Sequence, residues 1–127
     1  MSAAVQPGFA SPVHDAQAAF RSVMMAMARP GTVRRIESVP GTPPALEPAA
    51  AAVALALCDF ETPVWLDPAL AGDEAVTSFL AFHTGAPLTA SMAAAHFAFL
   101  PRGADVPEFT AFAQGELAYP DRSATLV

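Results

Sequence analysis

The sequence predicts one α/β domain over residues 1–127, in which helices are layered against a mixed sheet. Segments with helical periodicity alternate along the chain with short β-prone segments, and this alternation is typical of layered α/β folds. The chain has 127 residues, and 54% of them are hydrophobic. That length suffices for one domain with a buried core and is too short for two.

The first predicted element is a helix over residues 12–28. Ser11 is a suitable N-cap, Pro12 fits the first helical position, and the Pro-Gly pair at 30–31 ends the helix. A stripe of apolar residues recurs at helical spacing, namely Val13, Ala16, Phe20, Val23, Met24 and Met27. We expect this stripe to face the core, with its methionines and Met25 filling space there.

The rest of the chain alternates strands, helices and loops. Residues 32–39 are rich in β-branched side chains and predict an edge strand, whereas four prolines make residues 40–48 a rigid loop. Further helices are expected over residues 49–58, 73–83 and 108–114. Strands or extended segments are expected over residues 64–66, 86–89, 96–100 and 123–127. The last strand begins where the chain stops, so we expect the sequence to be the N-terminal part of a longer chain.

The charge is unevenly distributed and argues against several functions. The net charge is −6, yet residues 1–36 carry four Arg against one Asp, or +3, which leaves −9 for residues 37–127. An acidic chain is a poor match for general nucleic-acid binding, which needs a basic footprint. Because the chain has no lysine, it lacks the residue that binds pyridoxal phosphate as a Schiff base and the lysine of phosphate-binding P-loops.

Three features predict a cytoplasmic protein without a membrane anchor. The single Cys58 has no partner for an internal disulfide. The opening MSAAVQPGF lacks the basic and apolar regions of a signal peptide. The most apolar run, residues 49–58, is too short to span a bilayer.

Basic residues gather on and just after the first predicted helix. The candidate anion-binding residues are Gln17, Arg21, Arg29, Arg34 and Arg35. Gln17 and Arg21 share a polar helical face with His14. A guanidinium binds a phosphate or carboxylate through two parallel hydrogen bonds, so the cluster suits a phosphorylated ligand or an acidic partner. The alternative is a solvated face with local ion pairs.

His83 is the candidate catalytic residue. It falls on the inner face of the predicted helix 73–83, at the C-terminal turn, where the helix dipole favours a protonated imidazole that could transfer a proton. The alternative is a hydrogen-bonded structural histidine. His96, in an apolar strand, is a weaker candidate. The three histidines and Cys58 lack metal-ligand spacing, and no nucleophile elbow or glycine-rich phosphate loop occurs, so we expect neither a metal nor a cofactor.

Several short motifs resemble the H subunit of bacterial carbon-phosphorus lyase. They are Pro12–Gln17, Phe20-Arg21, Ala26-Met27, Pro30-Gly31, Thr62–Leu66, Phe82–Thr84 with Ala86–Leu88, and Ala124–Leu126. The motifs occur in the same order as in that family and extend over nearly the whole chain. Family members continue well beyond the equivalent of Val127.

The resemblance implies a fold similar to that of pyridoxal-phosphate-dependent transferases without their cofactor. It also implies a homodimer that joins the G, I and J subunits in the lyase core complex. That complex acts in phosphonate catabolism, where an alkylphosphonate displaces adenine from ATP to give a ribose 1-phosphonate 5-triphosphate. Catalysis of this step is usually credited to the I subunit, so an H subunit is expected to be accessory, with ATP or a phosphonate as its expected ligand.

Two other functions are kept as alternatives. One is an independent enzyme that acts on a phosphorylated metabolite with His83 as acid or base. The other is a non-catalytic dimeric scaffold in which Met24 and Met27 contact a partner instead of an internal core.

Overall fold

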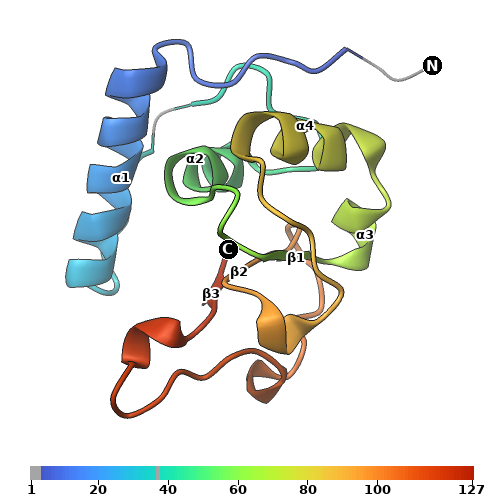
Figure 1. Cartoon of the computed structure of the whole chain (residues 1–127). Helices are drawn as coiled ribbons and strands as arrows, with labels where there is room; N and C mark the ends of the chain where they lie inside the picture. The colour runs from blue at the N-terminus through green and yellow to red at the C-terminus, as the bar shows by residue number, and fades with distance from the viewer. Residues whose placement is uncertain (1–3, 37) are drawn as a thin grey trace.

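The computed structural model describes residues 4–36 and 38–127, and its centre is a small parallel sheet. The strands are β1 (Val64–Leu66), β2 (Phe97–Phe99) and β3 (Thr125–Leu126), which lie in the order β1-β2-β3 (Figure 1). Val64 and Phe97 are partners in register, as are Phe97 and Thr125. The prediction of an α/β fold is confirmed, but the named strands are all parallel rather than mixed. Long connections separate them, as parallel pairing requires.

Alternate side chains of the strands point into two different apolar clusters. Val64, Leu66 and Phe99 are buried in the larger cluster beneath the helices. Trp65 and Ala98 point to the opposite face, where the Trp65 ring meets the Phe112 ring edge-on at a centroid distance of 5.6 Å. The period-two alternation of strands therefore gives this short sheet two buried faces.

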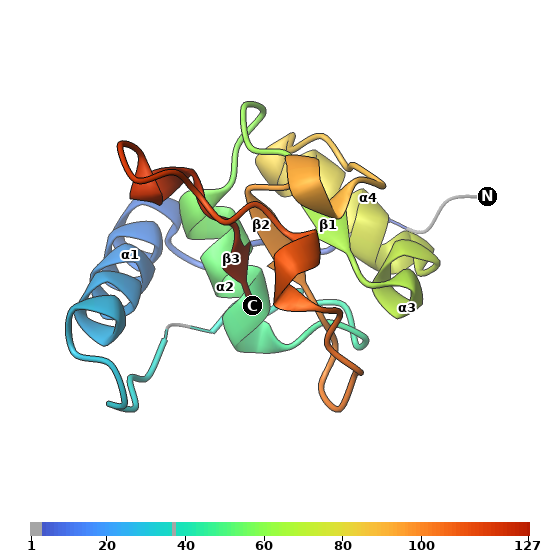
Figure 2. The same cartoon turned by 90° about the horizontal axis from the view of Figure 1, so that it is seen from below.

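Helices cover one face of the sheet, and irregular segments cover the other (Figures 1 and 2). The α-helices are α1 (Pro12–Ala28), α2 (Pro48–Leu57), α3 (Pro68–Ala71) and α4 (Glu74–Thr84). The single-turn 3₁₀ helices are η1 (Met92–Ala94), η2 (Phe109–Ala111) and η3 (Pro120–Arg122). Helix α1 packs beside α2 at the outside of the helical layer, so only part of its surface is covered.

The predicted helix boundaries are confirmed for the three longest helices. The Asp73 carboxylate caps α4 by accepting hydrogen bonds from the N–H groups of Ala75 and Val76 at 3.0 and 3.3 Å. Gly85 ends α4 with a φ of 68°, a left-handed conformation that glycine adopts without strain. The start of α1 differs in detail, because Ser11 makes no side-chain cap. Instead its backbone N–H donates to the Asp15 carboxylate at 2.9 Å.

Two predicted elements are wrong. Residues 32–36 and 38–39 do not form a strand, because no other described strand lies alongside to accept their hydrogen bonds; Glu37 lies outside the described residues. The helix predicted over residues 108–114 shrinks to the single turn of η2. The strand predicted over 96–100 is confirmed only for Phe97–Phe99, and His96 is exposed. The helical turn of α3 was not predicted.

The apolar stripe of α1 does not face the core as predicted. Val13, Phe20, Met24 and Met27 are 67, 50, 50 and 69% exposed. The buried residue of this helix is Ala19, with Ala16 and Val23 partly covered. The reason is that α2 offers a surface of buried alanines, Ala50, Ala51, Ala52 and Ala54, against which small residues of α1 pack most closely. Core packing thus selects a face of α1 next to the stripe and leaves the larger side chains outside.

Candidate functional site

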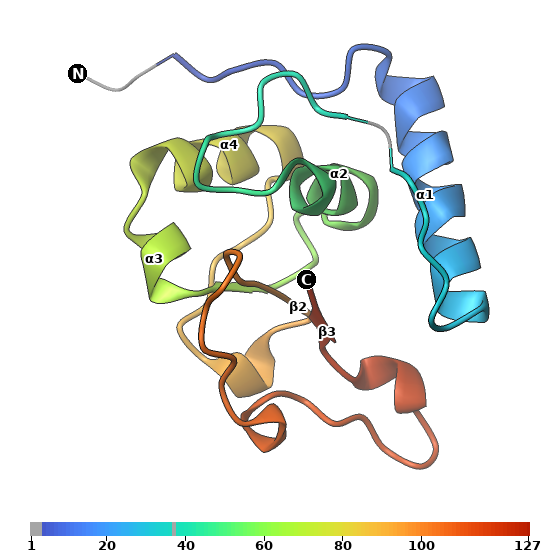
Figure 3. The same ribbon diagram turned by 180° about the vertical axis from the view of Figure 1, so that it is seen from behind.

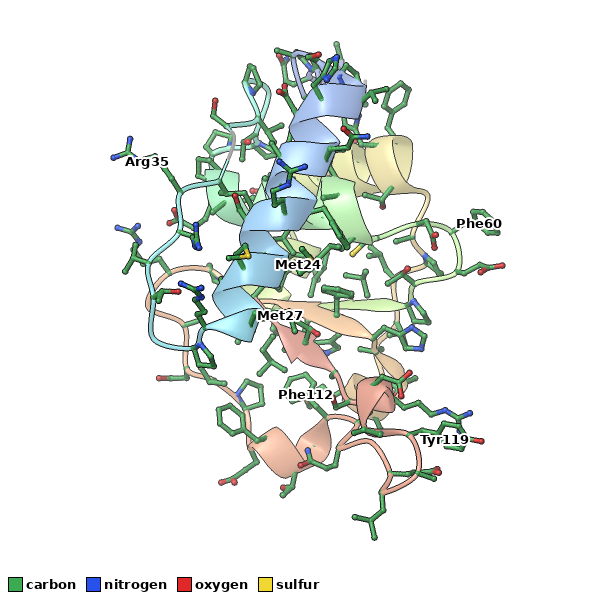
Figure 4. The ribbon with its side chains drawn as sticks, turned by 90° about the vertical axis from the view of Figure 1, so that its left-hand side faces the viewer. Met24, Met27, Arg35, Phe60, Phe112 and Tyr119 are labelled. Atoms are coloured by element: carbon green, nitrogen blue, oxygen red, sulfur yellow. The ribbon has the colours of Figure 1, made fainter. Side chains whose placement is uncertain are left out.

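The exposed side of α1 combines apolar and basic side chains. The exposed stripe formed by Val13, Phe20, Met24 and Met27, which we call the α1 stripe, extends along four helical turns. Figure 4 shows Met24 and Met27 along the outer surface of the helix. At about 100° per residue, Gln17 and Arg21 fall on the next face round the helix and are exposed as well. An apolar stripe bordered by a cation is typical of a protein contact surface.

The other predicted anion-binding residues extend this exposed surface. Arg29 follows the last turn of α1, and Arg34 and Arg35 lie in the segment that runs back beside the helix (Figure 3). All are exposed, and Figure 4 shows Arg35 pointing away from the molecule. Among the described residues, Arg102 forms an ion pair with Glu47 at 3.2 Å, and none of the four predicted arginines forms one with another described residue. Their role in anion binding stays a prediction.

His83 links α4 to the N-terminal arm. Its Nε2 atom donates a hydrogen bond to the carbonyl oxygen of Gln6 at 2.8 Å, and its ring packs against Phe79 and Phe82 at centroid distances of 4.5 and 5.0 Å. A Cβ atom at Gly8 would lie 3.1 Å from His83 Nδ1, so the arm passes directly over the ring. These contacts favour the structural alternative for His83. Its catalytic role stays a prediction.

Cys58 is protected from reaction by its surroundings. The residue is buried at the end of α2, and burial, together with the neighbouring Asp59 carboxylate, raises the pKa of its thiol to about 12. A thiol with so high a pKa stays protonated near neutral pH and is a poor nucleophile.

A hollow of about 530 Å³, which most of its lining residues supply with polar groups, opens where the three strands begin, and we call it the polar hollow. Its lining includes Thr62 and His96, which come just before β1 and β2, and Thr125, the first residue of β3. It also includes Arg122, the last residue of η3, and Ser123, which follows it. Asp121, Leu57 and Phe97 complete the lining. In Figure 4 this edge of the sheet lies between the labelled Phe60 and Tyr119. The hollow brings two basic groups, one acid and three hydroxyls together from three stretches of the chain.

Comparison with known proteins identifies the family. The family described as bacterial phosphonate metabolism protein (PhnH) matches residues 7–127. The chain belongs to the PhnH family. The predicted family resemblance is thereby confirmed.

One PhnH relative shows how far the likeness extends. The chain is 50% identical over 119 residues to alpha-D-ribose 1-methylphosphonate 5-triphosphate synthase subunit PhnH of Rhizobium meliloti (strain 1021). The aligned region covers 94% of this chain and 59% of the relative, so the chain spans 59% of the length of that protein. The relative is a subunit of a synthase, which supports partner subunits in general for a PhnH chain.

The PhnH motifs lie at structurally important positions. Pro12–Gln17 begins α1, Thr62–Leu66 leads into β1, and Phe82–Thr84 ends α4. The Ala86–Leu88 motif is extended beside β1, with the Val64 N–H donating to the Pro87 carbonyl oxygen at 2.9 Å. Several motifs thus support the packing of the fold, and only Thr62 and the 124–126 motif also reach the hollow.

Sequence reasoning missed most of the hollow. Arg122 and Ser123 are not among the predicted site residues, and His96 is predicted in a buried strand although it is exposed. The available signal was that polar residues precede three separate β-prone segments, since the starts of parallel strands meet at one edge of a sheet. Over residues 4–36 and 38–127, no group of three or more His, Cys, Asp or Glu side chains could hold a metal ion. None of the helices in the described part of the chain has the length and apolarity that a membrane crossing requires.

Proposed function

We propose that the chain is an accessory subunit of a phosphonate-metabolising complex. In this proposal it supports transfer of the ribose 5-triphosphate of ATP onto an alkylphosphonate with release of adenine. The main support is the 50% identity over 119 residues to a ribose 1-methylphosphonate 5-triphosphate synthase subunit. The same proposal includes a homodimer, the G, I and J subunits as partners, a fold like that of pyridoxal-phosphate-dependent transferases, and a cytoplasmic location.

The α1 stripe supports a role in assembly. Four large apolar side chains exposed along one helix need cover in a stable assembly, because water-exposed apolar area is unfavourable. Arg21 and the arginines after α1 border the stripe and suit an acidic partner surface. We therefore place the partner contact at α1 and the segment after it.

Co-purification tests the proposal. The chain is expressed with the G, I and J subunits, and an affinity tag on the I subunit is used for capture. We expect the chain to be recovered in stoichiometric amount with its partners. Failure to join them, with the chain folded by circular dichroism, would refute the proposed function. A parallel variant with Arg35→Glu tests the charged border and is expected to reduce recovery at low salt more than at high salt.

A dimeric scaffold is the second candidate function, because the same α1 stripe could pair with its copy on a second chain. Sedimentation equilibrium of the chain alone tests the shared homodimer, and co-purification with the other subunits distinguishes the accessory subunit from a dimeric scaffold that acts alone. A monomer at high concentration would exclude the scaffold. An independent enzyme that uses His83 is less well supported, since the Nε2 atom of that residue is bonded to the Gln6 carbonyl. Turnover of a phosphorylated metabolite by the chain alone, lost in His83→Ala, would support it.

A further inference from the structure

The polar hollow at the start of the strands has the chemistry of a ligand site. We infer that it binds a phosphorylated sugar, with Arg122 and His96 on the phosphate and Asp121 on a sugar hydroxyl. The residues that line the hollow, their positioning by the sheet and the pairing of basic with acidic side chains support this assignment.

Sheet hydrogen bonds fix the back wall of the hollow. The backbone N–H of His96 donates to the Pro63 carbonyl at 2.8 Å, and that of Thr125 donates to the His96 carbonyl at 2.9 Å. These bonds hold Thr62, His96 and Thr125 side by side where the three strands begin, and the centres of β1 and β2 are buried. A site on such a rigid support binds without the entropy cost of ordering a loop.

The front wall is the turn of η3, and two contacts hold it in place. A Cβ atom at Gly115 would lie 2.8 Å from the Pro120 carbonyl oxygen, so this close approach requires glycine, which also has a φ of 77°. The Arg122 guanidinium lies 3.9 Å from the centre of the Tyr119 ring. A guanidinium that packs over an aromatic face keeps the N–H donors around its own edge free to bind a ligand.

Arg122 is well suited to bind an anion. The chain has no lysine, and beyond residue 36 its arginines are Arg102 and Arg122. Arg102 pairs with Glu47 at 3.2 Å, whereas no carboxylate of the described residues lies within ion-pair distance of Arg122. A guanidinium can form two parallel hydrogen bonds to a phosphate, and the hydroxyls of Ser123 and Thr125 can donate further bonds.

Asp121 favours a ligand with sugar hydroxyls over a bare anion. Its carboxylate would repel an inorganic phosphate in the same hollow, but it can accept hydrogen bonds from sugar hydroxyls. Leu57 and Phe97 provide an apolar wall for the carbon face of a sugar. The volume of about 530 Å³ falls within the usual range for small-molecule sites, about 300–1,000 Å³. One acid, two basic groups and an apolar wall together fit a phosphorylated sugar better than a free phosphate.

Calorimetry on the full chain tests the inference with ribose 5-phosphate, inorganic phosphate and ribose as probes. The choice of ribose rests on the proposed function, whereas the anion contact rests on the lining alone. We expect ribose 5-phosphate to bind more tightly than inorganic phosphate, and ribose to bind least. Arg122→Gln should weaken the binding of ribose 5-phosphate and of inorganic phosphate about tenfold or more, because hydrogen bonds to charged groups are of that strength. His96→Gln provides a second variant with the same expected direction.

Two matched variants make the result decisive. Arg102→Gln removes an exposed arginine elsewhere and should leave both affinities within about twofold. Asp121→Asn should weaken ribose 5-phosphate and leave inorganic phosphate unchanged or tighter. The inference is overturned if ribose 5-phosphate does not bind at millimolar concentration, if Arg102→Gln has the effect of Arg122→Gln, or if Asp121→Asn affects both probes alike. These measurements need no partner subunit, so they are independent of the co-purification result.

Discussion

The double substitution Met24→Gln with Met27→Gln should separate assembly from folding. Met24 is 50% exposed and Met27 is 69% exposed in the chain alone. Complete burial of a methionine stabilises by about 1.5–3 kcal/mol, so covering the exposed fractions of both gives about 2–3.5 kcal/mol. Loss of that contribution weakens association about 30- to 400-fold. Folding should change by less than about 0.5 kcal/mol, because both sites are exposed and glutamine is about as helix-prone as methionine.

Two assays and one control measure this effect. Titration calorimetry of the chain into the other subunits gives the loss of partner affinity, and sedimentation equilibrium gives any loss of self-association. Urea unfolding followed by circular dichroism gives the stability. Ala18→Gln, an exposed position on the opposite side of α1 from the α1 stripe, is the control and should preserve association. Unchanged association in the double variant, or an equal loss in Ala18→Gln, would show that α1 does not form the contact.

Four further predictions test other features of the structure. Phe99→Ala should destabilise folding by about 3–5 kcal/mol in urea unfolding because the side chain is fully buried, whereas Val33→Ala, at a 97% exposed position, should be nearly neutral. The thiol of Cys58 should resist Ellman's reagent at pH 8 until the chain unfolds, and rapid labelling of the folded protein would contradict this. Because folding raises the pKa of this thiol from 9.0 to about 12, the free energy of unfolding should fall as the pH rises from 9 to 12. His83→Ala should destabilise by about 1 kcal/mol and speed proteolysis of the N-terminal arm; unchanged cleavage would show that the hydrogen bond does not hold the arm. Arg21→Ala should weaken ATP or phosphonate binding in calorimetry, and equal affinity would remove that residue from an anion site.

Local signals in the sequence predicted the elements that depend on neighbouring residues. Proline at the first helical position, an aspartate cap and a glycine stop located α2 and α4 to within a residue or two. The short strands β1 and β2 were found from their β-prone composition and flanking breakers. The segment 32–39 shows the limit of this reasoning, because β-branched residues form a strand only where a neighbouring strand supplies hydrogen-bond partners.

The candidate sites were predicted less completely than the fold. The predicted arginines lie on α1 and in the segment that follows it, and all four are exposed. The hollow was missed because Thr62, His96 and Arg122 are separated by more than twenty residues from one another and meet only when the strands pair. Register between parallel strands cannot be read from any one of them.

The first helix shows most clearly what each level decided. The sequence by itself determined where α1 begins and ends, and that it carries apolar and basic residues at helical spacing. Only the tertiary structure decided which face is buried. Because α2 presents alanines, close backbone approach favoured Ala19 over the larger Phe20 and Met24, which stay exposed. Helix periodicity is local, but burial depends on the surface that the rest of the chain presents.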